Sequence, residues 1–371
     1  MNRSAFLSEW DQIKRIVIKI GSNLIVDPNT EQIQFDLLNH LIDEILFLRN
    51  QQKEVILVSS GAIALGKKKI KTLIQNDSYQ NPSVIKKQAL ASIGQIELMK
   101  FYQNLFDEKK ILISQILITA KDFRDRETYL NIGHTLQEIL KLNVLPVINE
   151  NDTVSTDEIK FGDNDFLSAA VAALLNSQLL ILLTSVEGFL INNQRVSFLD
   201  KIDSEIIKHA KGPQGFGSGG MYSKIKVGKL CQQAGLHLAI LPGKEKHVLR
   251  RFYQGDDIGT LIYSTKRFLR ARKKWLLFSR SKGAIIVDEG AEKALRYKNS
   301  SLLWAGIKNI EGSFTYGDVV EIKNQKQEIL GRGIINIPSR ILRNRLNHEQ
   351  YPLKEFFPFE VIHRDDLILE D

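Results

Sequence analysis

The chain has 371 residues, of which 43% are hydrophobic and 25% charged, the balance of a globular protein. This length predicts one large and one small domain. No run of about 18 apolar residues occurs, so no membrane span is expected. The first ten residues lack the pattern of a secretory signal. The single cysteine, Cys231, excludes an intrachain disulfide and fits a reducing, cytoplasmic location.

The net charge of +8 is concentrated in one short segment. Residues 266–371 carry 20 basic and 14 acidic side chains, against 31 and 29 in residues 1–265. All of the C-terminal excess comes from Lys266, Arg267, Arg270, Arg272, Lys273 and Lys274. We interpret this cluster as a solvated linker, so a nucleic-acid partner is not expected.

Short apolar runs alternate with helical periodicity up to about residue 265. Strands are predicted at 16–20, 55–58, 111–118, 144–148, 179–183 and 238–241. Helices are predicted at 35–48, 130–140, 165–175 and 225–234. This alternation predicts an α/β fold, a mostly parallel sheet with helices on both faces. Ligands of such sheets bind outside the carboxyl ends of the strands.

The pattern changes in the C-terminal part of the chain. Strands are predicted at 275–278, 284–287 and 318–322, separated by many glycines. We therefore predict an α/β domain over 1–265, a basic linker over 266–274 and a small β-barrel-like domain over 275–371.

Two clusters of interest follow the first two strands. Lys19 lies inside an apolar strand just before Gly21, a residue that lets backbone approach a ligand closely. A buried lysine is unfavourable unless it is paired or faces a site, so Lys19 is either a catalytic cation or an edge lysine reaching solvent. The small-residue turn 59–64 (SSGAIA) predicts a helix cap or an anion site.

A third cluster consists of two acid–amide groups, at 149–152 (NEND) and 161–165 (FGDND). The first follows a strand and the second begins a helix. Carboxylates and amides at such places bind an ammonium group or Mg²⁺, or orient lysines. An ordinary capped loop explains one such group better than it explains two.

The fourth cluster, 215–224 (GFGSGGMYSK), precedes a predicted helix. Glycine-rich backbone followed by a hydroxyl and a lysine at a helix start is typical of a phosphate cradle, although a flexible loop has the same composition. A helix terminus contributes only about 0.3–1 kcal/mol to an exposed anion, so phosphoryl transfer also needs lysines. A carboxylate acceptor is already ionised at neutral pH and needs no general base, which agrees with the absence of histidine from the four clusters.

Together these clusters resemble the glutamate 5-kinase family of the amino acid kinase superfamily over nearly the whole chain. The matching segments are VIKIGS (17–22), SSGAIA (59–64), PVINEND (146–152), GDND (162–165), GSGGM (217–221), SK (223–224) and VDEG (287–290). The resemblance implies an amino acid kinase fold followed by a PUA domain. It implies transfer of a phosphoryl group from ATP, with Mg²⁺, to the γ-carboxylate of L-glutamate, giving γ-glutamyl phosphate in the first step of proline synthesis. It also implies inhibition by L-proline and a homo-oligomer, a dimer or tetramer.

The resemblance assigns roles to residues of this chain. Lys19 and Lys224 would hold the phosphates and the developing charge, and Asp165 would orient the lysines or the metal. Ser60, Asp152 and Asn164 would bind glutamate. The ATP site would comprise Lys19, Thr184, Ser185, Ser218, Gly219, Gly220, Met221, Tyr222, Ser223 and Lys224. The magnesium ion would be held mainly by the ATP phosphates.

One segment departs from the family pattern, which usually reads Leu-Thr-Asp, Gly-Leu-Tyr and Asp-Pro-Arg. Here residues 183–185 are LTS, 188–190 are GFL and 193–195 are NQR. The missing acidic residue and turn proline predict a looser loop on the nucleotide side.

Two other readings are open. A different amino acid kinase would phosphorylate aspartate, acetylglutamate, carbamate or UMP, and the C-terminal domain and paired acid–amide groups argue against it. An RNA-binding or RNA-modifying protein would use the PUA-like domain, which is close to neutral beyond the linker.

Overall fold

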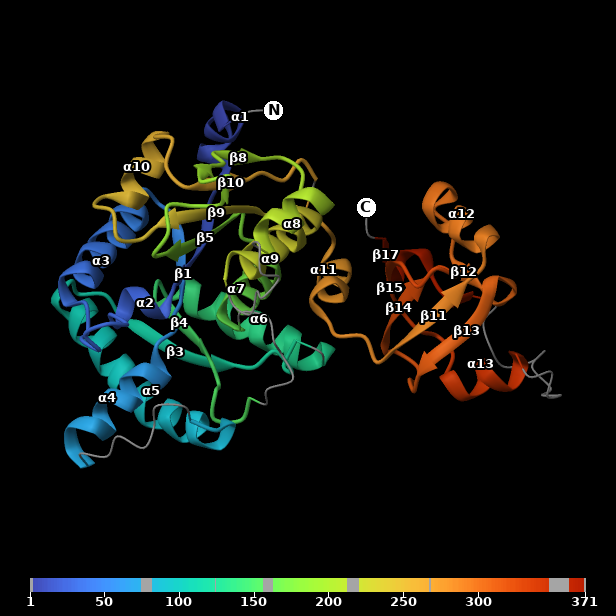
Figure 1. Cartoon of the computed structure of the whole chain (residues 1–371), viewed down its shortest axis with the longest axis horizontal. Coiled ribbons are helices and arrows are strands. Elements are labelled where there is room, and N and C mark those ends of the chain that lie inside the picture. The colour runs from blue at the N-terminus through green and yellow to red at the C-terminus, as the bar shows by residue number, and fades with distance from the viewer. Residues whose placement is uncertain are drawn as a thin grey trace. The chain divides into compact units, whose positions relative to one another are not determined.

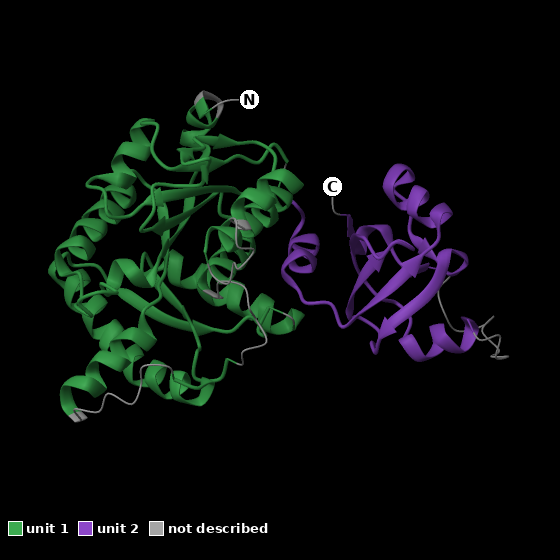
Figure 2. Ribbon diagram, viewed as in Figure 1, with its two compact units in different colours: residues 1–268 green, residues 269–371 purple. Residues whose placement is uncertain are grey.

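The computed structural model describes residues 3–74, 82–123, 125–155, 163–211, 220–266, 268–346 and 360–369. The chain divides into two compact units, residues 1–268 and 269–371 (Figure 2). The division falls inside the segment that the sequence predicts to be a linker.

An eight-stranded sheet forms the centre of the first unit (Figure 1). Its strand order is β3-β4-β2-β1-β5-β9-β10-β8, and β10 runs antiparallel to β9 whereas the pairs from β3 to β9 are parallel. The strands are β1 (Arg15–Ile20), β2 (Glu54–Val58), β3 (Ile113–Ile118), β4 (Leu145–Glu150), β5 (Leu179–Thr184), β8 (Phe198–Leu199), β9 (His237–Pro242) and β10 (Thr260–Ile262). The predicted α/β fold is therefore confirmed, with strand ends shifted by one or two residues.

Helices cover both faces of this sheet (Figure 1). They are α1 (Arg3–Ser8), α2 (Ser22–Ile25), α3 (Phe35–Asn50), α4 (Ala62–Ile74), α5 (Val84–Glu108), α6 (Arg126–Lys141), α7 (Asp163–Leu174), α8 (Ser204–Lys211), α9 (Met221–Ala234) and α10 (Val248–Gln254). Among them, α7 packs against β1, β4 and β5, while α3 packs against β2 and α10. A two-strand hairpin, β6 (Leu190–Ile191) and β7 (Gln194–Arg195), lies between β5 and β8 in the chain.

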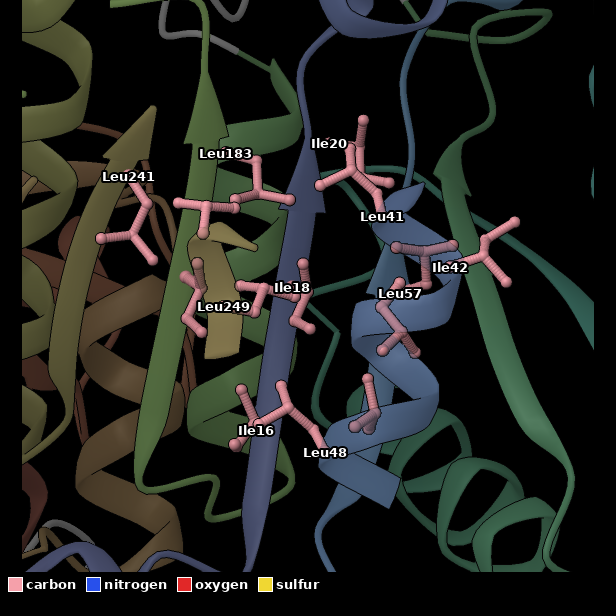
Figure 3. Packing of buried hydrophobic residues seen from close by; sticks show 14 of the residues in the cluster. Ile16, Ile18, Ile20, Leu41, Ile42, Leu48, Leu57, Leu183, Leu241 and Leu249 are labelled. Carbon is pink, nitrogen blue, oxygen red and sulfur yellow. The ribbon is translucent and has the colours of Figure 1, made fainter. Parts of the chain in front are cut away.

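The alternation of side chains along β1 separates the core from the site. Ile16, Ile18 and Ile20 belong to the apolar cluster that includes side chains of α3 and α10 (Figure 3). Because successive side chains of a strand point to opposite faces, Lys19 faces the other side, where α7 packs against β1. The apolar face thus holds the strand while the opposite face carries one buried cation.

The polar clusters meet where the order in which the chain adds strands to the sheet reverses. From β1 the chain adds β2 on one side, and it later adds β5 on the other. Parallel strands on both sides of such a switch point leave a crevice beyond their carboxyl ends. Lys19, Ser59 and Thr184 lie at or next to those ends.

Helices α4 and α5 pack through two glycines, which fixes the turn at 59–61. A Cβ on Gly66 would meet the backbone oxygen of Leu90 at 1.9 Å, and one on Gly94 would meet that of Ala62 at 1.8 Å. The close approach therefore requires glycine at both positions. It fixes the start of α4 at Ala62, two residues after Ser60.

The second unit contains a five-stranded sheet in the order β13-β11-β14-β15-β17 and a pair, β12-β16. The strands are β11 (Gly283–Val287), β12 (Leu302–Leu303), β13 (Ile307–Gly312), β14 (Val319–Lys323), β15 (Ile329–Ile334), β16 (Glu360–Ile362) and β17 (Leu367–Leu369). The helices are α11 (Ala271–Phe278), α12 (Glu289–Lys298) and α13 (Ser339–Leu346). A separate apolar core, including Ile285, Val320 and Leu330, stabilises this unit.

The prediction of a strand at 275–278 is wrong, because these residues end helix α11. All four side chains, from Trp275 to Phe278, are buried, and a continuous apolar run of that length does not distinguish a strand from a buried helix. The interpretation of 266–274 as solvated throughout is also wrong, since Lys274 is 1% exposed. Burial lowers the pKa of this lysine to about 8.

Within the described ranges, every helix is too short or too polar to cross a bilayer.

Candidate active site

A buried carboxylate joins two lysines at the carboxyl edge of the central sheet. The Nζ atom of Lys19 lies 2.8 Å from Oδ1 of Asp165, and that of Lys224 lies 2.7 Å from Oδ2. The Asp165 side chain is 3% exposed and both lysine side chains are 11% exposed. The three residues come from β1, α7 and α9, and the two helices pack against each other. Lys19 is therefore a paired, buried cation and not an edge lysine.

The charges of this trio depend on one another. Burial acts to raise the pKa of Asp165, but the two lysines outweigh it and hold that pKa below its ordinary value. Burial lowers the pKa of Lys19, the charge of Lys224 acts in the same direction, and Asp165 opposes both. Asp165 therefore favours the ionised form of Lys19, and its own lowered pKa keeps a carboxylate between the two lysines.

A cavity of about 510 Å³ opens beside the trio, within the size range of small-molecule sites. It is lined by Lys19, Gly21, Ser22, Asn23, Leu24, Leu183, Thr184, Ser185, Val186, Gly188, Phe189, Leu190, His209, Ala210, Gly220, Met221 and Lys224. Both lysines thus reach a cavity that also has an apolar wall. This combination suits a ligand with an anionic part and a flat apolar part.

The cavity contains six of the residues that the sequence assigns to an ATP site, namely Lys19, Thr184, Ser185, Gly220, Met221 and Lys224. Ser218 and Gly219 lie outside the described residues. Tyr222 and Ser223 do not line the cavity: the Tyr222 ring lies 4.5 Å from the Lys226 ammonium, and Ser223 is buried.

Helix α9 points the start of its backbone at the cavity. Its N-cap, Gly220, and its first residue, Met221, both line the cavity wall, and no side chain caps the helix. The first amide groups of a helix have no partner within it and favour an anion. The fourth residue of the same helix is Lys224. Backbone and side chain therefore present positive charge together.

The segment 184–195 contains a two-residue hairpin turn and is tied by Arg195 to the residues before β10. Asn192 and Asn193 have φ values of 50° and 61°, as the two central residues of a type I′ hairpin turn do. Arg195 donates hydrogen bonds to the backbone oxygens of Gly259 and Asp257 and to the Asp257 carboxylate. Asparagine tolerates positive φ. The two asparagines therefore form the turn in place of the missing turn proline.

Of the three residues assigned to glutamate, the structure places two in contact. The amide nitrogen of Asn164 donates to the Ser60 hydroxyl at 3.0 Å, which connects α7 with the end of β2. The amide oxygen of Asn164 is buried and accepts no hydrogen bond within the described part of the chain. Asp152 lies two residues beyond β4 and is partly exposed. An acceptor without a partner beside a hydroxyl is suited to a polar ligand.

Two buried residues of the acid–amide group at 149–152 have hydrogen-bond partners that the sequence analysis does not single out. The Asn149 amide donates to Oε1 of Gln95 at 2.8 Å, and Glu150 accepts from Ser155 at 2.7 Å. Burial raises the pKa of Glu150; the Ser155 hydrogen bond opposes this rise, and the charge of Asp152 adds to it. Gln95 lies in α5, far from the acid–amide motifs in sequence, and no local pattern indicates its position.

The apolar cavity wall was recognised only in part. Phe189 belongs to the GFL segment (188–190) that the sequence analysis places on the nucleotide side, whereas Leu24 and His209 belong to no motif. Sequence spacing reveals such residues only when they repeat along one element.

The described residues contain no group of three or more His, Cys, Asp or Glu side chains arranged to hold a metal ion. The buried carboxylate nearest the cavity, Asp165, already pairs with two lysines. Mg²⁺ often binds through one or two carboxylates and substrate phosphates while keeping several waters. The donor set therefore fits a magnesium ion that arrives with phosphates and not an all-protein metal cage.

Two family profiles match the chain. Residues 14–241 match the amino acid kinase family, and residues 283–349 match the PUA domain. Among solved structures, carbamate kinase from Giardia lamblia bound to AMP-PNP covers 68% of this chain and 99% of its own, at 16% identity and a TM-score of 0.49.

Curated relatives extend over nearly the full length. Glutamate 5-kinase from Dictyoglomus thermophilum is 40% identical over 376 residues, covering 98% of both chains. Those from Caldanaerobacter subterraneus and Pelagibacter ubique are 37% and 38% identical, over 96% of this chain and 97% and 98% of their own. The chain belongs to the amino acid kinase family and, within it, to the glutamate 5-kinases.

Proposed function

We propose that this enzyme transfers the γ-phosphoryl group of ATP to the γ-carboxylate of L-glutamate. The products are γ-glutamyl phosphate and ADP, and the reaction is the first step of proline biosynthesis. The observation that carries the proposal is the pairing of Lys19 and Lys224 through Asp165 beside a cavity of nucleotide size.

The two lysines supply the charge that phosphoryl transfer requires. The cavity accepts ATP with its phosphates toward Lys19, Lys224 and the start of α9. Negative charge spreads over the transferred group in the transition state, and catalysis consists mainly of positioning and electrostatic stabilisation. Asp165 holds both ammonium groups in place before substrates bind, which reduces the reorganisation needed during the reaction.

The acceptor needs orientation but no base. The glutamate carboxylate is ionised at neutral pH, so one of its oxygens can attack the γ-phosphorus directly. We assign Ser60, Asn164 and Asp152 to glutamate binding: the first two present a hydroxyl and an unpaired amide oxygen, and the third supplies a carboxylate for an ammonium group.

We further propose that Mg²⁺ accompanies ATP and neutralises phosphate charge when bound. Its ligands would be mainly the ATP phosphates, because Asp165, the buried carboxylate beside the cavity, already pairs with two lysines. We also propose a cytoplasmic homo-oligomer, a dimer or tetramer, inhibited by L-proline. The β3 edge supports assembly, because Leu112 and Leu117 there are 68% and 40% exposed. Light scattering would measure the mass in solution.

An acyl phosphate trap tests the reaction itself. The protein is incubated with ATP, Mg²⁺, glutamate and hydroxylamine, and the hydroxamate is measured against aspartate, acetylglutamate and no-acceptor controls. We expect hydroxamate with glutamate alone. Product with a different acceptor, or none from folded protein, would overturn the proposed substrate or the proposed activity, respectively.

A further inference from the structure

A threonine outside the cavity joins its apolar wall to the sheet. Thr260, the first residue of β10, is 0% exposed. Its hydroxyl accepts a hydrogen bond from the backbone nitrogen of Phe189 at 2.8 Å and donates one to the backbone oxygen of Val196 at 2.7 Å. Phe189 lines the cavity, whereas Thr260 does not. One side chain thus connects both ends of the β6–β7 hairpin to the sheet.

The contact is close enough to define the path of the chain. A Cβ on Gly188 would lie 2.7 Å from the Thr260 hydroxyl oxygen, and Gly188 has a φ of 148°. Glycine is therefore needed for the chain to cross β10 at this distance. The backbone nitrogen of Val196 also donates to the oxygen of Phe189 at 2.8 Å, which closes the base of the hairpin over Thr260.

An exposed cluster holds the same hairpin from outside. Arg195 contacts Gly259 and Asp257, and Arg3 of α1 lies 2.8 Å from the Asp257 carboxylate. The Ser197 hydroxyl donates to Asp257 at 2.5 Å. Residues 257–259, directly before β10, are thus bound to β7 and to Ser197. The Thr260 hydroxyl bonds to the same hairpin from its buried side.

We propose that Thr260 is a positioning residue for the nucleotide, acting through the Gly188–Leu190 wall of the cavity. The inference rests on the proposed function, in which that cavity holds ATP. Without the hydroxyl, the amide of Phe189 and the carbonyl of Val196 lose their partners, and buried polar groups without partners favour rearrangement. The wall then moves, while the acceptor side, built on β2, β4 and α7, keeps its contacts.

The test compares Thr260→Val, which keeps the shape and removes the hydroxyl, with Thr260→Ser, which keeps the hydroxyl. We expect Thr260→Val to raise the ATP KM about tenfold, equivalent to about 1.4 kcal/mol, with kcat at saturating ATP and the glutamate KM unchanged. Thr260→Ser should retain an ATP KM close to that of the wild type. Arg195→Gln, which loosens the hairpin from the surface, should raise the ATP KM in the same direction and tests the proposal even if Thr260→Val fails to fold.

Calorimetric titration with AMP-PNP tests separately whether the protein binds a nucleotide and whether Thr260 positions it. A wild-type protein that binds no nucleotide would refute the ATP site and with it the role of Thr260. If the wild type binds, equal affinities for the wild type, Thr260→Val and Arg195→Gln would refute only the positioning role. Parallel increases in both KM values, or equal losses in Thr260→Val and Thr260→Ser, would also refute it, because they would indicate general disruption.

Discussion

Replacing Asp165 by Asn removes one charge from a buried trio while preserving its shape. At the observed distances of 2.8 and 2.7 Å, an effective dielectric constant of about 20 gives roughly 6 kcal/mol of attraction per ion pair before desolvation is counted. That attraction offsets the burial of three ionised groups. In the variant, two ammonium groups lie near each other without a carboxylate, and losing one member of a buried pair costs about 3–5 kcal/mol.

The assay is thermal and urea-induced unfolding, measured with and without nucleotide. For a domain of this size, about 1 kcal/mol corresponds to 2–4 °C, so the Asp165→Asn variant should melt about 6–20 °C lower. Adding Lys224→Gln to it removes one unpaired cation and should restore about 1–2 kcal/mol. A single variant within about 1 kcal/mol of the wild type, or a double variant no more stable than the single, would refute the reasoning.

The pH dependence of this difference has a defined sign. Because the pKa of Asp165 is lowered on folding, its ionised form stabilises the protein fully above the unfolded pKa, and this contribution is lost as pH falls through the folded value. The gap between wild type and Asp165→Asn should therefore be constant near neutral pH and narrow in acid. A gap that widens in acid would mean that the carboxylate is not held ionised by the lysines.

Three further predictions concern residues around the trio. Lys224→Ala should lower turnover in the hydroxamate assay by about 10³ or more without unfolding the protein; a mild loss would place Lys224 outside the phosphate site. Asp152→Ala should raise mainly the glutamate KM, and a change confined to the ATP KM would reverse the assignment of the two substrates. Because burial raises the pKa of Glu150 from 4.5, its ionised form destabilises the fold as pH rises above that value. Glu150→Gln should therefore add up to about 1 kcal/mol at pH 8 and nothing at pH 4 by urea unfolding, and equal effects at both pH values would contradict this.

The sheet could be predicted from the sequence because its strands are buried on both faces. Segments such as 16–20 and 55–58 are apolar runs, interrupted only by Lys19, that are followed by glycine or serine, and those features are local. The same rule failed at 275–278, where a run of similar composition ends a helix. In that segment burial on all sides comes from the packing of the second unit, which no short window of sequence contains.

The residues of the candidate site likewise divide into those that could be predicted from the sequence and those that could not. Residues at strand ends and helix starts, such as Lys19 and Lys224, could be selected because their positions conflict with simple core patterns. Phe189 and Thr260 could not, since a buried aromatic residue and a strand threonine are ordinary in sequence. Their importance comes from a hydrogen bond across 71 positions of the chain, and long-range contacts of that kind appear only when the fold is known.

The composition of the trio explains why the site is built with two lysines and one aspartate. Two buried lysines alone would repel each other, and burial already lowers the pKa of Lys19, so one of them would tend to lose its proton. A single carboxylate between them opposes that loss at Lys19, and the formal charges of two lysines and one aspartate sum to +1, which attracts phosphates. A second carboxylate would neutralise the trio and remove that attraction. The arrangement observed around Asp165 is therefore the smallest that pairs two buried lysines with a carboxylate and still carries a formal positive charge toward an incoming anion.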